Sequence, residues 1–103
     1  MSNKSNKFLR QTGVTEDGRR VMGGIFEFYS TRGVPLDSVL SGMRVRGFEI
    51  DWLDLHDRAV EEGRMKPRKA VVTIESAARE SCAFTSDQVD EIMYRIRRLR
   101  PET

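Results

Sequence analysis

The chain has few residues of the kinds that form cross-links and metal centres: its 103 residues include one cysteine, one histidine and three prolines. Because Cys82 stands alone, an intramolecular disulfide and a multi-cysteine zinc site are both excluded. A single cysteine suits a reducing compartment, so we expect a cytoplasmic protein. No apolar run approaches the ~20 residues that a membrane-spanning helix needs.

Targeting signals are missing as well. The first residues, MSNKSNKFLRQTG, contain no apolar stretch after the lysines, as a secretory signal would require. Ser2 stands where N-myristoylation needs glycine, and the last residues, PET, form no prenylation motif. We therefore expect no membrane partner, and we interpret residues 1–17 as a basic, flexible arm in front of a single helical domain at 18–103.

Net charge is also small, although charged residues are abundant. Lysine and arginine total 18 against 16 aspartates and glutamates, which gives a net charge of +2, too little to indicate nucleic-acid binding from composition alone. The charges are instead separated along the chain. The segment 48–62 carries six carboxylates against one cation, Arg58, and the segment 64–69 that follows carries four cations. This segregation predicts an acidic surface and a basic one.

Apolar residues recur with the helical period through most of the chain. Helix starts and stops are marked by proline, glycine and capping residues. The expected helices cover about residues 18–31, 35–46 and 51–62, followed by one that begins at Pro67 and one capped by Thr85 or Ser86. Short connections between consecutive helices favour an all-α fold, a compact bundle of four to five short helices.

The first of these helices has an alternative. Gly23 and Gly24 each weaken a helix by roughly 1 kcal/mol, and the segment IFEFY at 25–29 has the composition of a strand. A β-hairpin that turns at Asp17-Gly18 would then replace the helix over 18–31. The sequence pattern leaves both interpretations open.

The one histidine, His56, stands among Asp54, Asp57 and Glu61, a set that suggests metal or acid–base chemistry. At ~100° per residue, however, His56 falls on the apolar face of its helix, whereas the carboxylates point away from that face. We therefore expect a partly buried histidine with a hydrogen-bond partner, and no metal or cofactor. Cys82 is expected to be a buried thiol with no base nearby, so the prediction is a non-enzymatic protein without a small-molecule substrate.

The cations that could contact a phosphate backbone form two groups. They are Arg64, Lys66, Arg68 and Lys69 before the fourth helix, and Arg95, Arg97 and Arg98 on the last helix. A helix-turn-helix does not fit, because the N-terminal part of a recognition helix contacts the bases. Both placements that the expected helices allow would lead that helix with carboxylates, either at residues 51–57 or at residues 87–91.

A smaller signal lies at the end of helix 35–46. Val45 is expected on the outer face of this helix, between Arg44 and Arg46. An exposed valine flanked by arginines suits the rim of a protein contact, where arginine is enriched.

Together these observations predict a small interaction protein: an adaptor, an inhibitor or an assembly subunit. Its size and character are those of small accessory proteins of phages and mobile elements. An acidic stripe of Asp54, Asp57 and Glu61 would bind a basic protein, the arginines of the last helix would bind an acidic one, and further copies of the chain could join the two surfaces. The alternative is a nucleic-acid-binding accessory or regulatory protein that uses the arm, the 64–69 cluster and the last helix.

Overall fold

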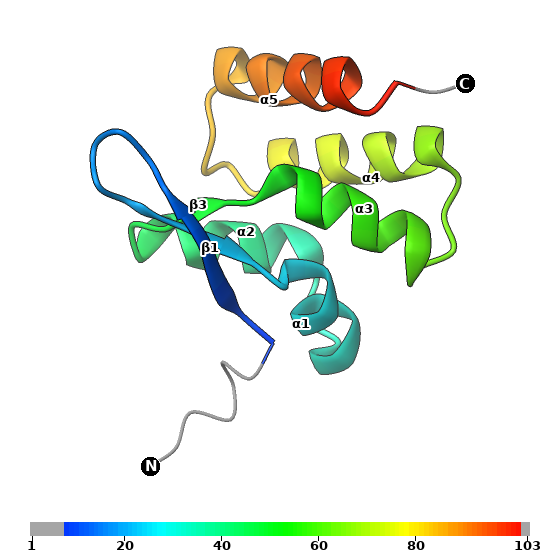
Figure 1. Ribbon diagram of the computed structural model, residues 1–103, viewed down its shortest axis with the longest axis horizontal. Coiled ribbons are helices and arrows are strands. Elements are labelled where there is room, and N and C mark those ends of the chain that lie inside the picture. Colours follow the sequence, from blue (N-terminus) through cyan, green and yellow to red (C-terminus); the bar gives the residue numbers. More distant parts are fainter. Residues whose placement is uncertain (1–7, 102–103) are drawn as a thin grey trace.

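The computed structural model describes residues 8–101 and shows five helices and a small sheet (Figure 1). Two strands come first, and a third strand lies between the second and third helices. In chain order the elements are β1 (Arg10–Val14), β2 (Arg20–Gly23), α1 (Ile25–Arg32), α2 (Leu36–Val45), β3 (Glu49–Ile50), α3 (Trp52–Glu61), α4 (Pro67–Glu80) and α5 (Ser86–Leu99).

The sheet has three strands in the order β1-β2-β3. β1 and β2 pair antiparallel as a hairpin with an irregularity between Gln11 and Gly13, and β3 adds to β2 in parallel. The hairpin turns at Asp17-Gly18, where Gly18 has a φ of 89° and its N–H donates to the carbonyl of Thr15 at 3.0 Å. Glycine adopts this left-handed conformation without the steric cost that other residues meet.

The all-α prediction, and with it the simple helical bundle, is therefore wrong. Residues 10–14, assigned to a flexible arm, form a strand, and residues 20–23 at the start of the expected first helix form its partner. Residues 1–7 of the arm lie outside the described residues. The alternative located the hairpin turn correctly at Asp17-Gly18, but it assigned 25–29 to a strand, whereas that segment lies within α1.

A close backbone approach separates the hairpin from α1. Gly24 has a φ of 83°, and a Cβ at this position would overlap the carbonyl oxygen of Phe8. Only glycine fits here, because both the backbone angle and the space exclude a side chain. Regular secondary structure is therefore interrupted at Gly24, and the helix that was expected from residue 18 begins only at Ile25.

The other helices start close to the expected positions. Pro35 precedes α2, the Asp51 carboxylate accepts the N–H of Asp54 at the start of α3, and Pro67 opens α4. Thr85 and Gln88 form a reciprocal capping box on α5, which satisfies two N–H groups that the helix leaves without partners.

The core lies where α3, α4 and α5 meet, with α1 packed against α3 and α2 packed against α4 (Figure 1). Leu55 of α3, Ile74 of α4 and Ile96 of α5 are almost fully buried. One expectation on a single residue turns out differently. Cys82 is exposed rather than buried and has a φ of 58°, because α4 ends before it.

Among the helices described, none combines the length and apolarity that a membrane crossing requires.

Candidate functional site

The acidic stripe predicted on α3 is engaged within the fold, beginning with Asp54. Its Oδ2 accepts the N–H of Gly24 at 2.9 Å, and its Oδ1 lies 3.6 Å from the guanidinium groups of both Arg10 and Arg58. The side chain is only 16% exposed. Asp54 therefore holds the hairpin against α3. A second contact between the same two elements comes from the Thr12 hydroxyl, which donates to the Asp51 carboxylate at 2.7 Å.

Asp57, the second residue of the stripe, is bound by the end of α5. Arg100 donates from Nε and Nη2 to the two carboxylate oxygens at 2.8 and 2.9 Å. The hydrogen bonds from Arg100, helped by a contact with His56, hold the pKa of Asp57 below its ordinary value. The same carboxylate raises the pKa of Arg100. This pair links two helices that are far apart in the chain.

Glu61, the third residue of the stripe, is more open, with 68% of its side chain exposed and Arg58 at 3.9 Å. Arg58 is the common partner of this region. It also lies 3.5 Å from Glu27 and 3.2 Å from Glu62, and these carboxylates, Glu27 foremost, raise its pKa. Asp54 and Asp57 are therefore paired within the fold, whereas Glu61 remains exposed at the surface.

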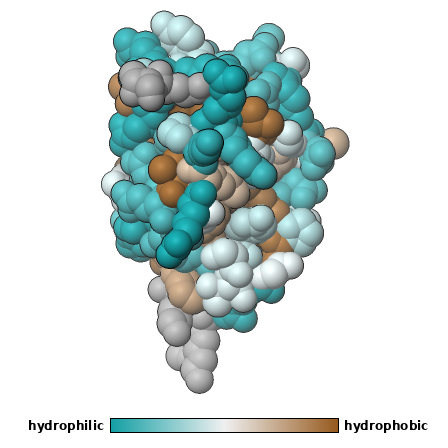
Figure 2. All heavy atoms as spheres, turned by 90° about the vertical axis from the view of Figure 1, so that its right-hand side faces the viewer, coloured by the Kyte–Doolittle hydropathy of each residue, from teal (hydrophilic) through white to brown (hydrophobic). Residues whose placement is uncertain are grey.

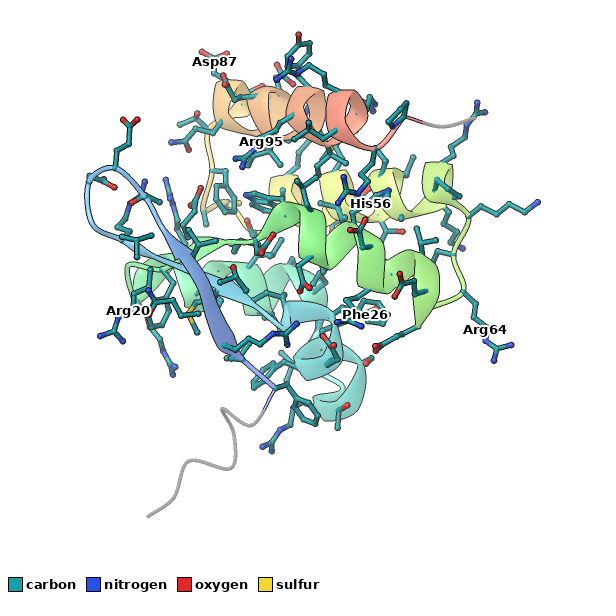
Figure 3. The ribbon with its side chains drawn as sticks, in the orientation of Figure 1. Arg20, Phe26, His56, Arg64, Asp87 and Arg95 are labelled. Atoms are coloured by element: carbon teal, nitrogen blue, oxygen red, sulfur yellow. The ribbon has the colours of Figure 1, made fainter. Side chains whose placement is uncertain are left out.

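His56 lies on α3 on the side that faces α5 (Figure 3) and is 4% exposed. Its Nδ1 is 3.1 Å from Asp57, whereas its Nε2 has no hydrogen-bond partner among residues 8–101. The expected burial and partner are both present. The helical-wheel argument nevertheless failed for Asp57, whose side chain reaches back to the histidine. Within the described residues no group of three or more histidine, cysteine or carboxylate side chains could hold a metal ion.

The predicted basic residues occupy separate places. Arg64, Lys66, Arg68 and Lys69 are exposed around the α3–α4 connection. Figure 2 shows the face at this end of the molecule, which is largely hydrophilic with small separated apolar areas. On α5, Arg97 pairs with Glu75 at 3.6 Å, Arg98 is exposed, and Arg95 borders a cleft toward the hairpin end of the molecule (Figure 3).

That cleft, of about 390 Å³, has a mixed lining. Trp52 and Phe84 meet edge to face at its base, and the guanidinium of Arg44 lies 5.0 Å from the centre of the Phe84 ring. Three arginines and three carboxylates share the lining, and Glu49 already pairs with two of those arginines, Arg19 and Arg44. The cleft therefore favours neither sign of charge in a ligand.

A different surface stands out, on the outer face of the sheet and along α2. It consists of two adjoining hollows that share Leu9 and Arg46, and we call it the basic groove. The sheet hollow, about 370 Å³, is lined by Leu9, Arg10, Gln11, Arg20, Met22, Arg46 and Phe48. The helix hollow, about 270 Å³, is lined by Leu9, Phe28, Val34, Ser38, Val39, Gly42, Met43 and Arg46.

The lining of the basic groove contains arginines but no carboxylate. Arg10 shares its charge with Asp54. Arg20 and Arg46 are exposed and form no ion pair within residues 8–101. The floor between them is mainly aliphatic. Apolar contact surface and uncompensated positive charge therefore occur together in this groove, unlike the mixed cleft.

One feature of the sequence pointed to this groove, the Val45 expected to be exposed between Arg44 and Arg46. Val45 is 82% exposed, and Arg46 stands at the junction of the two hollows. The rest was missed, because Leu9 and Arg20 were assigned to an arm and to a helix. The pairing of β1 with β2, and of β2 with β3, which packs against α2, brings them beside that helix.

Comparisons with models of known protein families, with curated proteins and with solved structures give no match to this chain.

Proposed function

We propose that the protein acts by binding another protein through the basic groove, as an adaptor, an inhibitor or an assembly subunit. The observation that carries this proposal is the combination of an apolar floor with two exposed arginines, Arg20 and Arg46, and no carboxylate in the lining. Protein interfaces have this composition, with apolar anchors at the centre and arginine enriched around them. This binding does not require the acidic stripe on α3.

The lining of the groove favours a peptide over a nucleic acid. Bases bind single-strand sites mainly by stacking on aromatic rings. Only two of the seven apolar side chains within residues 8–101 that line the groove, Phe28 and Phe48, are aromatic. Its other apolar residues are Leu9, Met22, Val34, Val39 and Met43. These aliphatic side chains bury leucine-like groups well, and each such group contributes about 1.5–3 kcal/mol when fully buried. The flexible methionines allow the floor to adapt to its occupant.

Nucleic-acid binding is the second candidate, and one observation favours it. Pro67 at the start of α4 and Arg100 after α5 line a common cleft, so the 64–69 cluster and the C-terminal end of α5 lie at one end of the molecule. Arg20 lies at the opposite end from Arg64 (Figure 3), so substitutions at the two ends separate the two candidates.

A steric block of the helix hollow tests the first candidate. Gly42 lies on α2 with open space around a Cβ, so Gly42→Gln should fill the hollow without strain and with improved helix propensity. The matched control is Ser76→Gln on the exposed side of α4. Peptides selected from a random display library on the wild-type protein should bind the Gly42→Gln variant at least tenfold more weakly, as measured by fluorescence anisotropy.

Ser76→Gln should leave the affinity unchanged. Failure to select any saturable binder, or binders that ignore Gly42→Gln, would contradict the proposal. A mixed-sequence duplex and a single strand should be titrated alongside. Tight binding of either that is lost with Arg64→Glu and Lys69→Glu, but kept with Gly42→Gln, would favour the second candidate.

A further inference from the structure

We infer that the occupant of the basic groove is an acidic segment with two apolar anchors, one for each hollow, and a carboxylate between them. This inference rests on the proposed function and names the chemistry of its partner. It follows from the way the two hollows are joined, from the charges that line them and from the charges that the rest of the surface offers.

The junction of the hollows determines the order of the groups. Leu9 and Arg46 line both hollows, so a chain that passes from one to the other must cross these residues. An apolar group on each side is accommodated by Met22 and Phe48 in the sheet hollow and by Val39 in the helix hollow. The partner residue that lies over Arg46 meets a guanidinium, and a carboxylate is the group that such a fork binds best in a peptide.

A second acidic residue is expected beyond the anchor in the sheet hollow. Arg20 lines this hollow and not the helix hollow, and it extends into solvent (Figure 3). Arg10 lies in the same hollow with its charge shared with Asp54 at 3.6 Å. The helix hollow offers Ser38 as its one polar side chain besides Arg46, so the partner is apolar there and acidic toward the sheet.

A second copy of the chain is a poorer occupant. Two of the three carboxylates of the stripe on α3 are already engaged, with Asp54 bound by Arg10, Arg58 and the Gly24 amide and Asp57 bound by Arg100. Releasing either carboxylate would leave an arginine of the donor copy without its partner. A separate acidic protein has no such cost.

The probes are two labelled synthetic peptides of equal length. Each has two leucine anchors, with glutamates between and beyond the anchors in one peptide and lysines at those positions in the other. The protein variants are Arg20→Glu and Arg46→Glu, with Arg64→Glu as the charge-matched control at the far end of the molecule (Figure 3). All three positions are exposed, so the variants should fold, and circular dichroism checks this.

The glutamate peptide should bind the wild-type protein at least tenfold more tightly than the lysine peptide, with an affinity that falls as salt increases. Arg46→Glu should weaken the glutamate peptide about tenfold or more and improve the lysine peptide, and Arg20→Glu should act in the same direction with a smaller factor. Arg64→Glu should change neither.

The failures of the two proposals are distinguishable. The acidic partner would be refuted if both peptides bound with equal affinity and Arg46→Glu had no effect. If Gly42→Gln still blocked binding in that case, the groove would remain a docking site. Library peptides that bind without regard to Gly42→Gln would overturn the groove itself. Concentration-dependent self-association that Arg46→Glu abolishes, measured by light scattering, would replace the acidic partner with a second copy.

Discussion

The guanidinium of Arg100 forms two hydrogen bonds with the carboxylate of Asp57, 43 positions earlier in the chain. This contact fixes the end of α5 on α3, beside the buried His56. Asp57, which the sequence analysis placed in a partner-binding stripe, thus joins two elements of the fold. Its substitution should therefore lower the free energy of unfolding.

We predict that Asp57→Asn lowers the free energy of unfolding by about 1 kcal/mol, since one charge-assisted pair is lost and partial exposure reduces its contribution. Glu61→Gln is the control on the same helix, and its effect should stay within about 0.5 kcal/mol because the side chain is largely exposed. Urea denaturation followed by circular dichroism measures both. Equal losses would mean that the Arg100 pair contributes no more than a surface contact.

The pH dependence of stability should carry the signature of the same pair. Hydrogen bonds from Arg100 lower the pKa of Asp57 in the folded state below its ordinary value of 3.8, so the unfolded chain binds the proton more tightly. The stabilisation is therefore complete above pH 3.8 and is lost as the pH falls through the lower folded-state pKa. Wild-type and Asp57→Asn proteins should converge in unfolding free energy in this acidic window. A difference that stays constant through this acidic window would refute the assignment.

The two glycines that flank α1 should respond very differently to a methyl group. Gly24→Ala meets both a left-handed backbone and the carbonyl of Phe8, and we expect a loss of about 3 kcal/mol or more. Gly33 has a φ of 73° but nothing within 4 Å of a Cβ, so Gly33→Ala should cost about 1 kcal/mol. Thermal or urea unfolding of the two variants would test this, and similar losses would show that the contact with Phe8 yields easily.

Cys82 should react with thiol reagents in the native protein, because it is exposed after the end of α4. The rate with a colorimetric disulfide reagent should approach that of the urea-unfolded chain. Protection by a large factor would restore the buried thiol that the sequence suggested. Cys82→Gly should be tolerated or slightly stabilising, by about 0.5 kcal/mol, since the left-handed φ of 58° suits glycine.

The parts of the fold that sequence could predict are those governed by local periodicity. Val89, Met93 and Ile96 follow the helical spacing on α5, and all three are buried. The hairpin has no such pattern, because four of the five residues of β1 are exposed and the alternation that indicates a half-buried strand is missing. The pairing that creates the sheet therefore leaves no trace in the composition of β1.

The candidate site was harder to predict for a related reason. A helical wheel places Asp54 outside the apolar face of α3 correctly, but it contains no information about the Gly24 amide or Arg10, which arrive from the hairpin. The basic groove depends on the same long-range step, since Leu9 and Arg46 line both of its hollows. A charged side chain on a helix face is available to a partner only where no residue from elsewhere in the chain pairs with it.

The position of Leu9 also has a practical consequence. This residue lines both hollows, so a tag joined ahead of Phe8 is tethered at the groove, whereas Pro101 lines a separate cleft together with Pro67. Tethering raises the local concentration of a linked segment to the millimolar range for short linkers. An acidic epitope tag on the N-terminal side would therefore compete with any acidic partner, and the same tag on the C-terminal side would leave the groove open.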